Sequence, residues 1–169
     1  MTAYVLLVAA VGIERLAELV VSTRNARWAF ARGGVEYGRG HYPVMSAMHA
    51  ALLVACVVEV AVADRPFLPW LGWPMLSLVV AAQALRWWCV ATLGHQWNTR
   101  VIVVPDLPLV TSGPYRWLRH PNYVAVVVEV AALPLVHTAW VTALAFTLAN
   151  AAVLSVRIPV EERALATVS

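Results

Sequence analysis

Long runs without charged residues dominate the chain and predict its architecture. Residues 40–58 and 67–85 each form an uncharged stretch of 19 residues, and residues 130–156 form one of 27. A bilayer core of about 30 Å is crossed by roughly 20 apolar helical residues. We therefore predict five membrane-crossing helices, at about residues 2–21, 43–63, 68–93, 122–137 and 139–156.

The last two predicted helices form one long apolar segment that must be divided. Residues 122–156 would make a single helix about 52 Å long at 1.5 Å per residue, which is too long for one crossing. Pro134 and the polar residues His137 and Thr138 lie near its middle, where a turn fits. We therefore expect a hairpin of two short, tilted helices.

Composition identifies the class of protein. Hydrophobic residues make up 62% of the 169 positions and charged residues 12%, against about 25% charged in soluble domains. So few charges cannot cover the surface of a small water-soluble domain. This excludes a soluble enzyme, a disordered tail and a nucleic-acid-binding module. We expect one all-α integral membrane domain over residues 1–169, with three helices in 1–93 and a loop, hairpin and tail in 94–169.

The arginines predict how the chain is oriented. All 12 basic residues are arginine, and five crossings place nine of them on one side. These nine are Arg24, Arg27, Arg32, Arg39, Arg100, Arg116, Arg119, Arg157 and Arg163. The positive-inside rule then predicts an outside N-terminus and a cytoplasmic C-terminus. The absence of Lys, with abundant Ala and Val, suggests a GC-rich bacterial source and therefore the bacterial inner membrane.

The first candidate for chemistry is the polar stretch 111–123, which ends where the fourth predicted helix begins. Pro121 suits the first helical turn, and the helix N-terminus with Arg116 and Arg119 favours a bound anion. Anchoring to anionic lipid headgroups is the alternative. His120 and a fixed turn favour a ligand site, because lipid anchoring requires neither.

The second candidate is the tail with Arg157, Glu161 and Glu162. A hairpin would return these residues to the side of the membrane that holds Arg119 and His120. Adjacent carboxylates beside a basic cluster could bind a cationic ligand or diol hydroxyls. The alternative is a solvated helix end with weak local ion pairs.

Carboxylates inside the predicted helices form a third set, because charges at membrane depth usually face the protein interior. Arg86 is a candidate partner for Glu14 or Glu18, which share a helical face. Glu129 could line a substrate pocket or pair with another helix. The polar segment 94–100 also stands out, with no role assigned. The histidines lack metal-ligand spacing, and no phosphate loop or nucleophile elbow is present, so we predict no metal site.

Two of these features resemble a known family when taken together. The chain reads Arg-His-Pro-Asn-Tyr at residues 119–123, then a 37-residue gap, then Glu-Glu at residues 161–162. The preceding residues 109–115 also look like the lead-in of this pattern. The chain from about residue 94 to 165 resembles the isoprenylcysteine carboxyl methyltransferases and related membrane methyltransferases.

The resemblance implies a site and a cofactor. S-adenosylmethionine would be held in a cytoplasmic pocket, with Glu161 on one of its polar groups. Arg157, which matches the family's tail arginine, would lie toward the acceptor, and we expect Arg157 and Glu161 to be catalytic. Glu129 has no counterpart in the eukaryotic enzymes and is expected at the substrate. The expected cofactor-binding residues are Leu107, Leu109, Val110, Tyr115, Arg119, His120, Pro121, Tyr123, Glu161 and Glu162.

We therefore expect methyl transfer to an acidic hydroxyl or carboxylate of a lipophilic acceptor from the bilayer. A long-chain phenolic or pyrone-type lipid and a prenylcysteine-like compound both fit. The alternatives are a phospholipid or amine N-methyltransferase and a non-enzymatic membrane protein. The expected partners are the acceptor and membrane lipid, without nucleic acid or an obligate protein partner.

Overall fold

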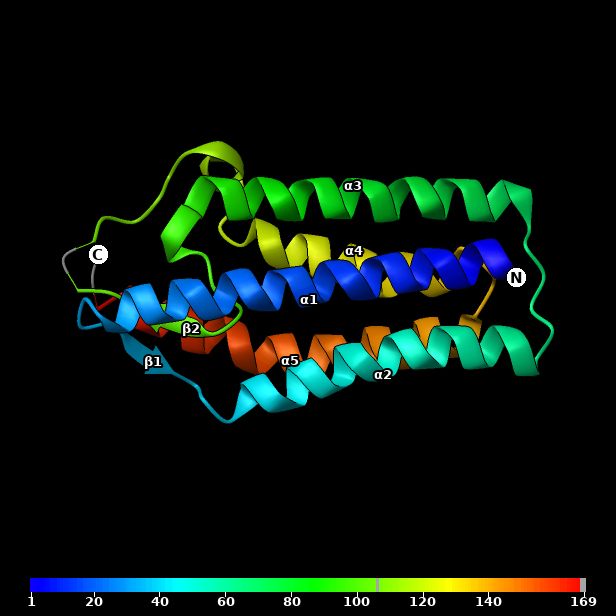
Figure 1. Ribbon diagram of the computed structural model, residues 1–169, viewed down its shortest axis with the longest axis horizontal. Helices are drawn as coiled ribbons and strands as arrows, with labels where there is room; N and C mark the ends of the chain where they lie inside the picture. Colours follow the sequence, from blue (N-terminus) through cyan, green and yellow to red (C-terminus); the bar gives the residue numbers. More distant parts are fainter. Residues whose placement is uncertain (106, 168–169) are drawn as a thin grey trace.

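Five helices run along the length of the molecule and form an elongated bundle (Figure 1). The computed structural model describes residues 1–105 and 107–167, with the side chain of His41 excepted. The N- and C-termini lie at opposite ends of the bundle, as five passes require. The five predicted helices are confirmed. They are α1 (Thr2–Phe30), α2 (His41–Val62), α3 (Pro69–Leu93), α4 (Pro121–Leu135) and α5 (Trp140–Leu165).

The predicted hairpin is confirmed, with a turn at residues 136–139 between α4 and α5. At this turn Glu59 of α2 accepts hydrogen bonds from the backbone N–H groups of Val141 (3.2 Å) and Thr142 (2.7 Å). A carboxylate there satisfies free donors and interacts favourably with the positive end of the α5 dipole. Of the two helices only α4 is short, because α5 continues nine residues past its predicted end at 156. The last turns of α5 are stabilised as helix because one face, which includes Arg157 and Ala164, is buried.

A two-stranded antiparallel sheet, which the sequence analysis did not predict, joins two loops at one end of the bundle. Strand β1 (Val35–Tyr37) follows α1, and β2 (Val101–Val103) follows α3. Glu36 pairs with Ile102 in the register. Three-residue strands are too short to show an alternating pattern, so only the tertiary pairing reveals them. Val101 and Val103 are buried against Ala164 of α5, which fixes the C-terminal turn to the sheet.

Apolar side chains form a core between the helices and also cover the outside of the bundle. Val8, Leu52, Val79 and Leu133 are buried in one cluster, while side chains such as that of Val62 (81% exposed) point outward. Within the described chain, α2, α3 and α5 are long and apolar enough to cross a membrane, yet only 22–28% of each apolar window is buried. Exposed apolar faces of this extent are typical of contact with lipid.

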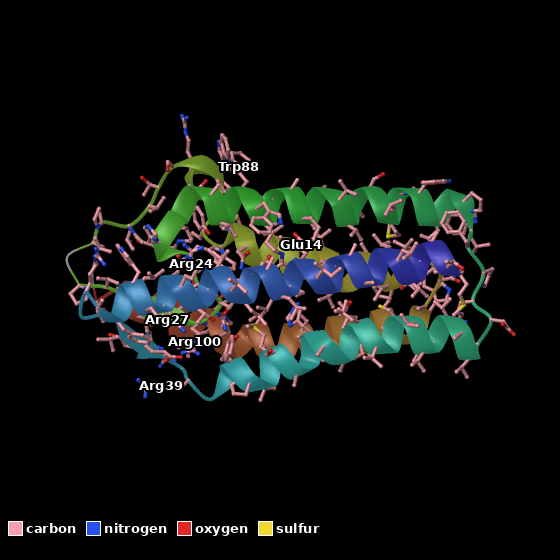
Figure 2. All side chains as sticks on the ribbon, viewed as in Figure 1. Glu14, Arg24, Arg27, Arg39, Trp88 and Arg100 are labelled. Carbon is pink, nitrogen blue, oxygen red and sulfur yellow. The ribbon has the colours of Figure 1, made fainter. Side chains whose placement is uncertain are left out.

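A buried ionic cluster connects α1, α3 and α4 inside the bundle. Arg86 of α3 contacts Glu129 of α4 at 2.8 Å and Glu18 of α1 at 3.4 Å, which confirms its predicted pairing. Arg15 contacts Glu18 at 2.9 Å and Glu129 at 3.5 Å. Glu14, midway along α1, accepts hydrogen bonds from α3 side chains (Figure 2). Charged side chains at membrane depth are tolerated here because each has an oppositely charged or polar partner.

Removal of the Arg86 charge should destabilise the bundle. The substitution Arg86→Gln leaves Glu129 and Glu18 short of a buried cation, and breaking a buried ion pair from one side costs about 3–5 kcal/mol. Thermal unfolding of the detergent-solubilised protein measures this. The exposed Arg24→Gln is the matched control and should unfold within about 0.5 kcal/mol of the wild type. Equal stability of the two variants would contradict a supporting role for the cluster.

Candidate functional site

A cavity of about 570 Å³ opens at the end of the bundle where α1, α3 and α5 finish and α4 begins. Arg24, Arg27, Arg39 and Arg100 lie at this same end (Figure 2). Its volume is within the range of about 300–1,000 Å³ of small-molecule sites. The predicted site residues that line it are Leu107, Leu109, Val110, Tyr115, Arg119, His120, Tyr123, Arg157, Glu161 and Glu162.

Two predicted site residues do not line the cavity. Pro121 is fully buried at the first position of α4, where its fixed φ suits the start of a helix. Glu129 is 1% exposed and contacts Arg86 and Arg15 in the ionic cluster. The structure therefore brings the tail glutamates to the start of α4, as the hairpin hypothesis requires, and places Glu129 away from them.

A chain of hydrogen bonds joins α4 to the end of α5 at the cavity wall. The Tyr123 hydroxyl donates to Glu161, and Nε of Arg157 donates to the Tyr123 oxygen at 2.8 Å. Nη2 of Arg157 donates to the backbone carbonyl of Thr99 in the loop after α3. Because the Tyr123 hydroxyl is both a donor and an acceptor, its proton has one orientation and both partners are held in place.

His120 lies between the two tail carboxylates. Its Nδ1 is 3.6 Å from Oε1 of Glu161, and its Nε2 is 3.5 Å from Oε1 of Glu162. The nearby carboxylate of Glu161 raises the pKa of His120 above its ordinary value of 6.5, although burial acts in the opposite direction. Burial also raises the pKa of Tyr115, so this phenol stays protonated at neutral pH. The site therefore holds an imidazole that readily carries a positive charge between two acids.

The loop at residues 94–99 supplies a further wall, to which the sequence analysis assigned no role. His95, Gln96, Trp97 and Asn98 line the cavity. Asn25 of α1 donates to the carbonyls of Gly94 (3.0 Å) and Trp97 (2.7 Å).

Ser22, one helical turn before Asn25, fastens the end of this loop. Its hydroxyl lies 2.8 Å from Oδ1 of Asn98 and accepts from the N–H of Thr99 at 3.1 Å. Ser22 and Asn25 stand three apart on one face of α1 beyond its apolar part, and this spacing is the sequence signal for such a polar contact.

One buried side-chain atom among the described cavity residues lacks a protein partner. Oδ1 of Asn122, beside His120, is buried with no hydrogen-bond donor among the described residues. A buried acceptor of this kind is normally satisfied by a ligand or water. The cavity thus offers acceptors (Asn122, Glu161, Glu162), cationic groups (Arg119, Arg157) and an apolar side at residues 107–110. Within residues 1–105 and 107–167, no group of His, Cys, Asp and Glu is arranged to hold a metal ion.

Comparison with known proteins shows what the chain is similar to. The family model described as "Isoprenylcysteine carboxyl methyltransferase (ICMT) family" matches residues 75–167. The chain is 38% identical over 161 residues to YpbQ of Bacillus subtilis (strain 168), with 95% of each chain covered. It is 27% identical over 154 residues to a protein of Haemophilus influenzae, covering 89% of this chain and 88% of that protein. Both relatives are described as uncharacterized.

A solved structure has a similar fold. The eukaryotic intramembrane Ras methyltransferase ICMT superposes with a TM-score of 0.57 at 27% sequence identity. The match covers 74% of this chain and 46% of the eukaryotic chain. This chain therefore spans about half the length of that protein.

The Asn25 contacts should hold the loop at residues 94–99 in place. The substitution Asn25→Ala leaves the buried carbonyl of Trp97 without this donor, which costs about 1–3 kcal/mol locally. Hydrogen exchange of the loop amides should therefore be faster. Thr23→Ala is the control, because this exposed hydroxyl bonds within its own helix, to the carbonyl of Leu19. Unchanged exchange in the Asn25 variant would show that other contacts hold the loop.

The raised pKa of His120 predicts a pH-dependent contribution to stability. Charged His120 stabilises the folded state fully below about pH 6.5, and this stabilisation is lost as the pH rises through the raised pKa. The melting temperature of the wild type should exceed that of His120→Gln most below pH 6.5, with the difference shrinking toward pH 8. Thermal scans between pH 5.5 and 8.5 test this. A difference that is constant or grows with pH contradicts the charged pairing.

Proposed function

Because the chain belongs to the isoprenylcysteine carboxyl methyltransferase family of membrane methyltransferases, we propose that it transfers a methyl group from S-adenosylmethionine to an oxygen of a lipophilic acceptor. The observation that carries this proposal is the joining of His120, Tyr123, Arg157 and Glu161 at one cavity wall. These residues are separated by up to 41 positions, so a purely local role in capping a helix does not explain their convergence.

The cavity residues fit this cofactor chemically. An ammonium group or ribose hydroxyls suit the carboxylates of Glu161 and Glu162, and an amine suits the buried Oδ1 of Asn122. A carboxylate suits Arg119 and the N-terminus of α4. The apolar residues Leu107, Leu109 and Val110, with Tyr115, suit a flat adenine ring. Pro121 supports this site indirectly, because it sets the start of α4.

The residues of the chain act by positioning rather than by covalent catalysis. Methyl transfer from a sulfonium is an in-line displacement, so it requires an aligned nucleophile in a site that excludes water. The acceptor oxygen gains the methyl group, and the electron pair of the broken carbon–sulfur bond stays on sulfur. A carboxylate acceptor releases no proton, whereas a phenol or enol loses its hydroxyl proton. In our proposal Arg157 orients the acceptor oxyanion, and Glu161 holds the cofactor.

The length of α4 supports entry of the acceptor from the bilayer. Its 15 residues span about 22 Å, less than the hydrocarbon core of about 30 Å. The turn at His120 then lies below the membrane surface, within reach of a lipid-tailed molecule. We place this end at the cytoplasm because arginines cluster there. The acceptor classes we propose are phenolic or pyrone-type lipids and prenylcysteine-like carboxylates. Glu129 has an assembly role in this proposal, because its carboxylate pairs with two arginines.

The experiment is methyl transfer by membranes that contain the expressed protein. Incubation with S-adenosylmethionine labelled in the methyl group, together with a total lipid extract, should place the label in a lipid ester or ether. Glu161→Gln should lower the initial rate at least about a hundredfold, because it removes a charged partner of the cofactor. The exposed Arg24→Gln should retain the wild-type rate.

The outcomes separate the alternatives. Label in aminophospholipids would assign N-methylation to the same scaffold. Absence of labelling in every lipid class, together with absence of S-adenosylhomocysteine binding by calorimetry in detergent, would contradict the proposed function. Labelling that survives Glu161→Gln at the full rate would contradict the assigned role of this residue.

A further inference from the structure

The short 3₁₀ turn η2 (Gly113–Arg116) and the residues that follow it have two faces of different character. Pro114 is fully buried and Tyr115 lines the cavity, so one face belongs to the protein interior. The four residues Arg116–Arg119 are all exposed, and among them the tryptophan is 68% and the leucine 41% exposed. Bulky apolar side chains between two arginines are typical of a segment at the boundary between membrane and water.

The turn η2 is packed closely against the last turns of α3. Gly113 has a φ of +56°, and a Cβ at this position would lie 2.5 Å from Oγ1 of Thr92. Glycine permits both this backbone conformation and this close approach. The N–H groups of Trp117 and Leu118 donate to the carbonyl of Pro114 at 3.3 and 3.1 Å. The exposed side chains after η2 are therefore presented in a defined direction.

An aromatic pair joins this exposed segment to α3. The ring of Trp117 lies 6.0 Å from that of Trp88 in a T-shaped arrangement. Trp88 is 45% exposed and lies at the outer edge of the bundle, on the side of α3 away from α1 in this view (Figure 2). Tryptophan favours the level of the lipid headgroups because its ring is apolar and its N–H is polar.

The lengths of two helices place the segment at the same level. The 25 residues of α3 span about 37 Å, so the helix extends a few ångströms beyond a hydrocarbon core of about 30 Å. Trp88 precedes the end of α3 by little more than one turn and therefore lies close to the edge of the core. Pro121 begins α4, the short helix whose first turn lies below the membrane surface. Residues 116–119, directly before it, therefore run along the interface.

The charge of the segment fits an anionic headgroup. Arg116 and Arg119 are both exposed and flank the two apolar side chains. The Arg119 side chain is 89% exposed and lies 3.6 Å from Glu162, so a carboxylate offsets part of its charge. The guanidinium of Arg116 is a planar fork of donors that matches two oxygens of a phosphate. A phosphate at this arginine and acyl chains beside the tryptophans complement both parts of the surface.

We propose that Arg116, Trp117 and Leu118, together with Trp88 of α3, form a docking surface for an anionic phospholipid of the surrounding leaflet. The lipid phosphate binds the guanidinium of Arg116, and the acyl chains pack on the two tryptophan rings. The inference goes beyond the proposed function, because it holds whatever reaction the cavity carries out. Its effect on the cavity passes through η2, since the docked lipid steadies the turn that places Tyr115 in the cavity wall.

Fluorescence quenching in phosphatidylcholine vesicles tests the docking surface. The protein is titrated with brominated phosphatidylglycerol or with brominated phosphatidylcholine. The chain has eight tryptophans, so the part of the quenching that is lost in Trp117→Phe is the part that reports this surface. For the wild type this part should reach half its maximum at about fivefold lower mole fraction of the anionic lipid, the factor expected for one arginine near an anionic headgroup.

Variants at Arg116 separate recognition of charge from ordinary contact with lipid. Arg116→Gln should remove the preference, so that the two lipids quench at mole fractions within about twofold of each other. Arg116→Lys keeps a positive charge and should retain most of the preference. Arg24→Gln, which removes an exposed arginine at the same end of the bundle, should retain all of it.

Hydrogen exchange tests the effect on the cavity wall. The backbone N–H groups of Tyr115, Trp117 and Leu118 donate within the turn. Their exchange in the wild type should be at least about threefold slower in vesicles that contain phosphatidylglycerol than in phosphatidylcholine alone, because a docked lipid opposes local opening. In Arg116→Gln the exchange should be the same in both kinds of vesicle.

Three results would overturn the proposal. Equal quenching of the wild type by the two lipids would show that the surface makes only unspecific contact with the bilayer. A full preference in Arg116→Gln would place the headgroup elsewhere. Amide exchange in the wild type that does not respond to the anionic lipid would remove the connection to the cavity. These measurements need neither cofactor nor acceptor, so their failure is distinct from failure of the proposed function.

Discussion

The contact of Tyr123 with Glu161 and Arg157 connects the first turn of α4 to the last turns of α5, and the site depends on it. Without this connection the tail would be an ordinary helix end with weak ion pairs in solvent. With it, an acid, a phenol and a guanidinium share one hydrogen-bond chain at the wall of the cavity. The hairpin turn at residues 136–139 is what allows this contact, because it returns the chain to the end of the bundle where α4 began.

The bilayer imposes the second constraint, because every charge within it must be paired or lie at an end. The chain meets this in two ways. At mid-depth, Arg15 and Arg86 pair with glutamates from α1 and α4 and leave the apolar faces free to contact lipid. At the cavity end, charged groups remain available for ligands because α4 is short and the loops cover the site. Arginine and glutamate therefore hold the helices together at mid-depth, and in the proposed function they bind ligands at the cavity end.

The N-terminal third of the chain does more than add membrane-crossing helices. Asn25 and Ser22 of α1 fasten the loop that follows α3, and β1 pairs with β2 beside Arg157. The match to the family model begins at residue 75, so Ser22, Asn25 and β1 lie outside the matched residues. Methyl-transfer geometry is sensitive to small displacements, so such supports have consequences for function although they carry no chemistry.

The sequence by itself determined the class of protein, the number of helices, the hairpin and most of the predicted residues that line the cavity. Membrane thickness sets the length of an apolar run, so such a run can be recognised from consecutive residues alone. The motif at residues 119–123 and the acids at 161–162 can likewise be recognised in the sequence without the structure. Only the tertiary structure decided which polar groups meet. It placed Glu129 with Arg86 and away from the cavity, paired two three-residue strands, and brought Arg100 to the wall beside Arg157. Such pairings depend on helix rotation and on loop paths between distant segments, and a short polar stretch carries no periodic signal that specifies either.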